Sequence, residues 1–171
     1  MSAFPELPGT LKIEAEVLER WSRHGIPKRC REHRPEAERF VFYEGPPTAN
    51  GKPGLHHVFG RTLKDTVCRH RLMRGYHVPR RAGWDTQGLP VEIEVQKTLG
   101  IGTRQAIEEI GIEAFNRLCR ESVFTYIDVW LQLSERMGYW LDYDEPYVTL
   151  DPAYIESCWA ILSRFHGAGL M

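Results

Sequence analysis

The sequence predicts an α/β fold in which short parallel strands are joined by a helix. The run FVFY at residues 40–43 is aromatic and β-branched and too short for a helix, which indicates a buried strand. A Pro/Gly loop follows, and apolar residues then recur every four positions, as on one face of a helix beginning near His56 or His57. These apolar residues are Leu55, Phe59, Leu63 and Val67. A second short strand at 76–81 completes a β-α-β unit, whose default is parallel pairing with a right-handed crossover.

Length and composition indicate one globular domain. With 42% hydrophobic, 11% aromatic and 26% charged residues, the 171-residue chain has the composition of a folded soluble protein and not of a disordered one. Its four cysteines are far apart and form no C-x-x-C pair, which argues against a zinc site within the chain. No apolar run approaches a membrane span and no signal peptide is evident, so a cytoplasmic protein without membrane contact is expected.

The first 38 residues are predicted to form an N-terminal helical extension. Residues 11–23 place Ile13, Val17 and Trp21 on one helical face, which must dock on the rest of the protein. Gly25 and Pro27 are expected to end this helix, with a charged loop at 28–38.

A helical stretch is predicted to follow the second strand. Pro90 opens a helix through residue 99, and helical spacing over 104–137 is broken near Gly111. Asp151 followed by Pro152 indicates the start of a last helix, and its expected buried face is Ile155, Trp159 and Leu162. No third parallel strand is evident, and two parallel strands are too few to stand alone. We therefore expect the chain to be a fragment of a larger fold.

The start of the central helix is a candidate phosphate site. A strand feeding a helix through a Gly-bearing loop directs free backbone N–H groups and the positive dipole end toward a ligand above the sheet. His56 and His57 lie at this end, while the dinucleotide and Walker fingerprints are absent. Arginines and lysines concentrated between residues 61 and 81 suit phosphates or RNA. The alternatives are a solvated loop with two incidental histidines and a solvated basic helix face.

Asp85 is a second candidate on the same rim. It is expected in a loop, residues 82–90, at the carboxyl end of the second strand, where open α/β sheets bind ligands. Its carboxylate either meets a cationic ligand group or forms a turn or a helix N-cap.

Four segments resemble the opening of the catalytic domain of isoleucyl-tRNA synthetases. They are EGPPTANG (44–51), LKD (63–65), MRGY (73–76) and GWDTQGLPVE (83–92). The match is collinear and covers nearly the whole chain, whereas leucyl and valyl enzymes resemble it more weakly. The resemblance implies that residues 39–171 are the first half of a class I synthetase Rossmann-like nucleotide-binding fold. It also implies that an N-terminal helix precedes this half and that an editing domain, zinc-binding elements and an anticodon-binding domain follow it.

The resemblance implies ATP-dependent activation of isoleucine and its transfer to tRNA(Ile) in a full-length, monomeric isoleucine–tRNA ligase, with the fragment inactive alone. Mg²⁺ would arrive with ATP, and zinc would bind only downstream of this chain. Catalytic roles fall on His57 and His56. The implied ATP-binding residues are Thr48, Asn50, Gly51, Gly54, His56 and His57, and the implied amino-acid-binding residues are Gly45, Pro46, Asp85 and Gln87.

Three positions, 54, 56 and 87, depart from the family pattern. The usual His-x-Gly-His is Gly54-Leu55-His56-His57 here, an exchange that a minority of isoleucyl enzymes share, and Gln87 stands where the family often has His. A non-catalytic synthetase-like protein that binds a nucleotide or RNA is the alternative function, and a class I synthetase for another aliphatic amino acid is a further one.

Overall fold

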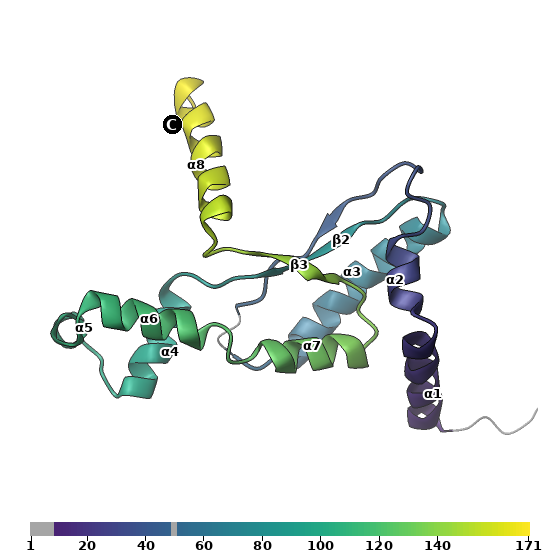
Figure 1. Cartoon of the computed structure of the whole chain (residues 1–171), viewed down its shortest axis with the longest axis horizontal. Helices are drawn as coiled ribbons and strands as arrows, with labels where there is room; N and C mark the ends of the chain where they lie inside the picture. Colours follow the sequence, from purple (N-terminus) through teal and green to yellow (C-terminus); the bar gives the residue numbers. More distant parts are fainter. Residues whose placement is uncertain (1–8, 49–50) are drawn as a thin grey trace, which may run out of the picture.

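A computed structural model describes residues 9–48 and 51–171, in which helices surround a small parallel sheet (Figure 1). The helices are α1 (Thr10–Arg23), α2 (Ile26–Arg31), α3 (Leu55–Met73), α4 (Leu89–Leu99), α5 (Arg104–Ile110), α6 (Ile112–Ser122), α7 (Ile127–Arg136) and α8 (Pro152–Gly167). The strands are β1 (Phe42–Tyr43), β2 (Arg80–Trp84) and β3 (Asp142–Val148).

The sheet has the order β1-β2-β3 and all its pairings are parallel. The predicted strand, helix and parallel strand are confirmed as β1, α3 and β2, but the strand limits were wrong. β1 begins only at Phe42, and β2 covers Arg80–Trp84 instead of 76–81. Gly75, with φ 100°, terminates α3, and Pro79 has no N–H to pair, so the chain pairs continuously only from Arg80 onward.

The third strand, β3, corrects the prediction that only two would be found. Its sequence DYDEPYV carries three acids and a proline, which is unlike a buried parallel strand. β3 is an edge of the sheet among the described residues, where charged residues and proline are tolerated. Arg81 lies opposite Asp142 and Trp84 opposite Val148, with an irregularity in register between them.

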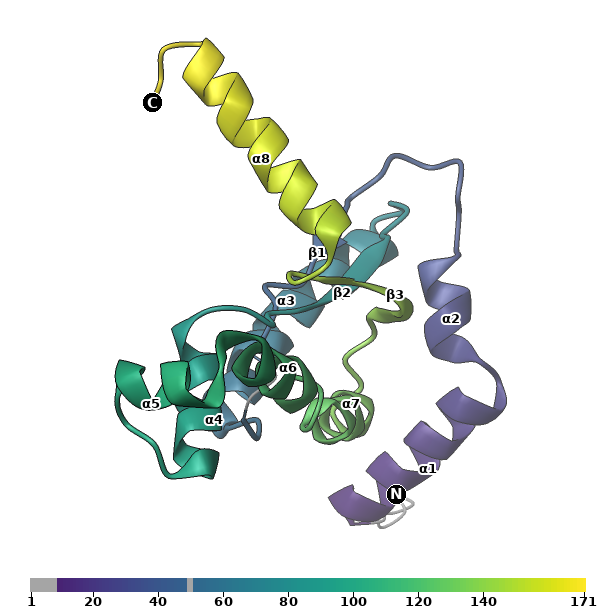
Figure 2. The same ribbon diagram turned by 60° about the vertical axis from the view of Figure 1, so that its left-hand side comes forward.

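The core lies between the sheet and α7. One cluster joins the buried side chains of Trp84 and Trp130, and a second joins Ala82, Tyr139 and Leu141. Helices α4, α5 and α6 form a separate helical lobe beside the sheet, held together mainly by contacts of α6 with α4 and α5 (Figure 2). The helical run predicted over 104–137 is interrupted at Gly111, as expected, and also at residues 123–126, between α6 and α7.

The apolar stripe of α3 is a helical face, as predicted, but it is not buried by any described residue. The exposed fractions of Leu55, Phe59, Leu63 and Val67 are 83%, 67%, 55% and 51%. The buried positions of α3 are instead Arg61 and Cys68. Spacing identifies an apolar face, but which face contacts the sheet depends on partners that spacing does not reveal.

The apolar face of helix α8 is also largely exposed. The helix extends away from the sheet (Figure 1), and Trp159 is 66% exposed although it was predicted to be buried. The predicted start is correct, because Asp151 occupies the N-cap and Pro152 the first turn.

The N-terminal helix is confirmed as α1, but the charged loop predicted at 28–38 was wrong at its start. Gly25 adopts a left-handed conformation, with φ 59°, and Pro27 opens α2 instead of ending α1. Of the predicted docking face, Trp21 packs edge-to-face on Trp140 with ring centroids 4.9 Å apart, while Ile13 remains 37% exposed. The aromatic contact is therefore at the carboxyl end of α1, and Glu14 nearer its start adds an ion pair with Arg136 of α7 at 2.6 Å.

We predict that Gly83→Ala destabilises the fold by about 1–3 kcal/mol because its methyl group would overlap the phenol ring of Tyr147. The matched control is Gly60→Ala within α3, where an added methyl group meets open space and should stabilise the helix by up to about 1 kcal/mol. Urea denaturation measures both. Equal unfolding midpoints for Gly83→Ala and the wild type would contradict the close approach.

Candidate functional site

Helix α3 begins at Leu55, directly after an extended Gly54 that serves as its N-cap. The His57 amide donates to the Gly54 carbonyl at 3.0 Å, and the Gly54 amide donates to His57 Nδ1 at 2.9 Å. Because Nδ1 accepts a hydrogen bond, the neutral imidazole carries its proton on Nε2. His57 therefore caps its own helix with one nitrogen and offers an N–H donor with the other.

The imidazole of His57 is held neutral near pH 7. Burial lowers its pKa below 6.5, and the neighbouring His56 and the cations Arg61 and Lys64 lower it further, while the hydrogen bond with Gly54 opposes them. A neutral histidine at a helix N-terminus also avoids repulsion from the positive dipole end.

The exchanged motif has a steric basis in this helix start. The exposed His56 ring lies 3.8 Å from the His57 ring between centroids, and it folds back over Gly54. A Cβ atom at position 54 would approach His56 Cε1 to 2.9 Å. A side chain at position 56 in this rotamer therefore favours glycine at position 54.

A cavity of about 330 Å³ opens beside the helix start. Five of the predicted site residues line it, namely Gly45, Pro46, Thr48, His56 and His57. Six lining residues were not predicted as site residues, namely Glu44, Pro47, Gly60, Arg61, Lys64 and Trp130. Gly54 adjoins the cavity through His57, and Gly51 is held by Trp130, whose indole Nε1–H donates to the Gly51 carbonyl at 2.9 Å. The predicted residue Asn50 lies outside the described residues.

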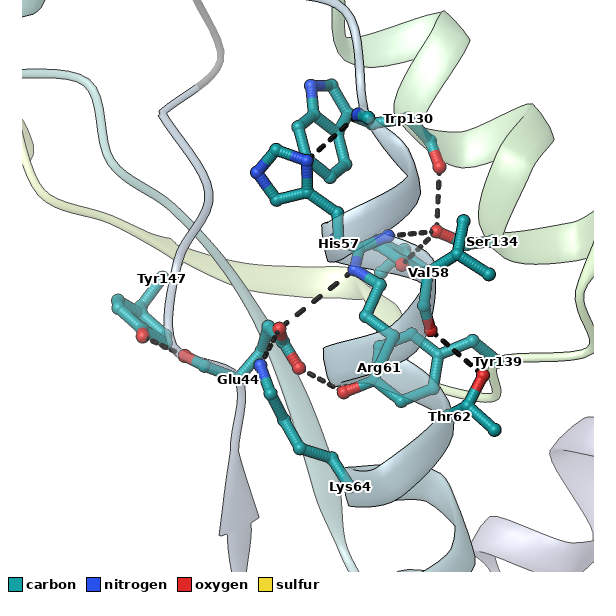
Figure 3. A network of polar contacts seen from close by, with 12 residues as sticks. Glu44, His57, Val58, Arg61, Thr62, Lys64, Trp130, Ser134, Tyr139 and Tyr147 are labelled. Carbon is teal, nitrogen blue, oxygen red and sulfur yellow. Dashed lines mark hydrogen bonds and ion pairs between the residues drawn. The ribbon is translucent and has the colours of Figure 1, made fainter.

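A buried carboxylate connects the walls of this cavity. Glu44 is 3% exposed, and its Oε1 lies 2.6 Å from Lys64 Nζ and 4.0 Å from Arg61 Nε (Figure 3). Tyr139 donates its hydroxyl to Oε2, and the hydroxyl of Tyr147 donates to the Glu44 carbonyl. Burial and the hydrogen bond to the carboxylate raise the pKa of Tyr139 far above its usual range, so this phenol remains a donor. The Glu44 side chain, directly after β1, thus joins α3 to the segment between α7 and β3.

Asp85 directly follows β2, at the edge of the sheet where the loop after β1 also lies. It does not line the cavity. Its amide donates to the Pro47 carbonyl at 3.0 Å, and it forms a parallel bridge with Thr48. Its Oδ1 is 3.5 Å from Thr149 Oγ1. Asp85 does not cap α4, because the N-cap of that helix is Gly88. Gln87 is exposed and does not line the cavity.

Sequence reasoning missed three contributors to the site. Trp130 was assigned to the core because it lies in a helical apolar run, and Thr149 follows a strand that was not predicted. Glu44 carried a usable signal, since a lone acid directly after an apolar strand is either exposed or paired.

A helix that starts above a parallel sheet, after a glycine-bearing loop, is an arrangement typical of proteins that bind nucleotides between strand ends and helix starts. Residues 16–171 match the family described as tRNA synthetases class I (I, L, M and V), and the chain therefore belongs to that family. A solved leucyl-tRNA synthetase of Agrobacterium radiobacter K84 shares the fold with a TM-score of 0.60 and 21% identity, covering 92% of this chain and 18% of that one.

The most similar relatives compared are isoleucine–tRNA ligases. The protein of Dehalococcoides mccartyi strain CBDB1 is 49% identical over 160 residues, which is 94% of this chain, and that of Bacillus thuringiensis subsp. konkukian is 52% identical over 158 residues, or 92%. The ligase of Deinococcus radiodurans is 48% identical over 168 residues, or 98% of this chain. The chain spans only 15–16% of the length of these relatives.

Residues 9–48 and 51–171 contain neither a membrane-spanning helix nor a cluster of metal ligands. No described helix is long and apolar enough to cross a membrane. No group of three or more histidine, cysteine, aspartate or glutamate side chains in this described part is arranged to hold a metal ion.

We expect Glu44→Gln to lower the free energy of unfolding by about 3 kcal/mol, because it leaves the Arg61 guanidinium, 4% exposed, without its counter-charge. Glu145→Gln is the matched control, since that carboxylate is 79% exposed and its pair with Arg81 is worth at most about 1 kcal/mol. Urea denaturation at neutral pH compares the two. A loss below 1 kcal/mol for Glu44→Gln would show that the network does not carry the fold.

The lowered pKa of His57 predicts a loss of stability in weak acid. Below about pH 6.5 the unfolded chain binds this proton before the folded chain does, so the contribution of His57 is complete above that pH and declines as the pH falls through the lowered pKa. His57→Gln keeps an acceptor for the Gly54 amide but cannot titrate, so its unfolding free energy should fall less between about pH 7.5 and 5. Identical pH profiles for the two proteins, with exposed His70→Gln as control, would refute this assignment.

Proposed function

We propose that this chain is the first part of the catalytic domain of an isoleucine–tRNA ligase. The observation that carries this proposal is 48–52% identity to isoleucine–tRNA ligases over nearly all of the chain. The site supports it, because three of the predicted nucleotide residues, Thr48, His56 and His57, line one cavity at a helix start, and Asp85 lies on the adjoining rim. The short span relative to these relatives supports a longer ligase, with residues 39–171 as the first half of its nucleotide-binding fold.

The reaction we propose is attack of the isoleucine carboxylate on the α-phosphate of ATP, with loss of pyrophosphate, followed by transfer of the isoleucyl group to tRNA(Ile). Such chemistry depends on alignment and on stabilisation of phosphate charge. His57 would donate Nε2–H to a phosphate oxygen, with the backbone N–H groups of the helix start beside it. His56, exposed at the cavity, would take the place of the first histidine of the usual motif. Mg²⁺ bound to ATP would neutralise phosphate charge.

Asp85 would hold the α-ammonium group of isoleucine. Its side chain lies at the carboxyl end of a central strand, next to the loop that contains Gly45 and Pro46. Its only described side-chain contact is the 3.5 Å approach of Thr149, which leaves acceptor capacity for a cation. Gln87 would contribute at the outer edge of this pocket, and its exposure is compatible with closure on the ligand.

The remaining proposals concern parts beyond these 171 residues. tRNA(Ile) would bind mostly through other domains, which would also hold any zinc, and the complete ligase would act as a cytoplasmic monomer. The 171 residues alone are expected to show no isoleucine-dependent pyrophosphate exchange, because the second half of the nucleotide-binding fold is needed to complete the ATP site.

A chimera tests the proposed function. This chain replaces the aligned segment of the Deinococcus radiodurans ligase, which matches 98% of it. Isotopic pyrophosphate exchange should depend on isoleucine and be weaker with leucine or valine. A folded chimera without exchange, beside an active parent ligase, would favour a non-catalytic nucleotide- or RNA-binding protein. Exchange that prefers valine or leucine would favour another class I specificity.

In this chimera, Asp85→Ala should lower kcat/KM for isoleucine roughly 10- to 150-fold and leave the KM for ATP nearly unchanged, since a lost charge-assisted contact to an ammonium is worth about 1.5–3 kcal/mol. Asp144→Ala is the control, because Asp144 is exposed on the edge strand. Wild-type kinetics toward isoleucine in Asp85→Ala would reduce Asp85 to a turn former.

A further inference from the structure

Trp130 connects two segments that are far apart in sequence at the helix start. It comes from α7, 79 residues after Gly51, whose carbonyl accepts its indole N–H at 2.9 Å. Its side chain is almost fully buried, at 2% exposed. A buried hydrogen bond from a rigid helix to a loop carbonyl fixes where that loop lies.

The same indole ring also contacts His57. The two ring centroids are 4.7 Å apart and the planes meet at 77°, an edge-to-face arrangement (Figure 3). Gly51 and His57 lie on either side of the Gly54 N-cap. Trp130 therefore holds the incoming loop with its polar edge and the histidine with its ring.

Polar contacts fix the orientation of Trp130 itself. The Arg61 guanidinium lies 4.7 Å from the indole centroid and donates to Ser134 Oγ at 2.6 Å. Ser134 in turn donates to the Trp130 carbonyl at 2.6 Å and accepts from the Tyr143 hydroxyl at 2.9 Å. Packing alone requires only an aromatic ring here, whereas the Gly51 contact requires an N–H group.

We propose that Trp130 is a positioning residue for the nucleotide: through its N–H group and its ring it sets the Gly51 backbone and the His57 imidazole at the spacing needed to receive ATP phosphates. This inference rests on the proposed function, because it assumes that the cavity takes ATP. The proposal assigns a role in nucleotide alignment to α7, which belongs to the helical segment after β2. This segment lies outside the motif at the start of α3.

The test uses the chimeric ligase with Trp130→Phe, which keeps a ring but removes the N–H donor. A neutral hydrogen bond of this kind predicts a roughly 2- to 10-fold fall in kcat/KM for ATP, with the KM for isoleucine within about twofold of the unmodified chimera. Trp140→Phe is the matched control, because Trp140 packs on Trp21 and Arg69 and does not line the cavity, so it should leave the KM for ATP unchanged. Unaltered ATP kinetics in folded Trp130→Phe would overturn the proposal.

If Trp130→Phe does not fold, benzothienylalanine at position 130 retains the indole shape and lacks only the N–H group, so the same kinetic expectations and the same overturning result apply to it. The contact with His57 is tested in the 171-residue chain by NMR titration, independently of catalysis. Trp130→Ala should raise the His57 pKa toward 6.5, while Trp130→Phe keeps it low.

His56, Arg61 and Lys64 on α3 also act on the His57 pKa, and Glu44, directly after β1, lines the same cavity. These residues remain unchanged in the Trp130 variants. An unchanged His57 pKa in folded Trp130→Ala would overturn the ring contact. An unmodified chimera without isoleucine-dependent exchange would instead refute the proposed function, and the titration would still report on Trp130.

Discussion

The buried carboxylate of Glu44 is the interaction on which the rest of the structure depends. A carboxylate removed from water is tolerated only where charges and donors surround it, and here Lys64, Arg61 and Tyr139 do so. These partners come from α3 and from the segment before β3, while Glu44 itself directly follows β1. The ion network therefore specifies how the central helix lies on the sheet, a task that the apolar stripe of α3 does not perform among the described residues.

The candidate site residues at the start of α3 line the same cavity as this network. Arg61 pairs with Glu44 on one side and packs on Trp130 on the other, so the charge that fixes α3 also fixes the helix α7. The helix start is consequently supported from two directions. Such support matters for a reaction that needs alignment more than a nucleophile, because small displacements of phosphate donors weaken their effect on developing charge.

Much of the fold was predictable from the sequence, but its contacts were less so. The β-α-β unit and most helix starts follow from local chemistry, such as Pro90 in a first turn and Gly75 after a last one. β3 was missed because an edge strand can be polar, and the burial of the apolar face of α8 was misjudged because spacing does not identify a partner. Of the site, the helix-start residues were predictable, while Glu44 and Trp130 gained their roles only from tertiary contacts.

The long separation between Gly51 and Trp130 has a consequence for the order in which the protein can fold. β2 pairs with β3, and the Gly51 carbonyl bonds to Trp130, so both early segments need residues that are synthesised much later. Contacts between residues far apart in sequence are characteristic of slowly folding topologies. At about 5–20 residues per second, the ribosome adds α7 about 4–16 s after the loop. During that interval the helix start exists without its support, so early segments on the ribosome are exposed to chaperones and proteases before the cavity beside α3 is complete.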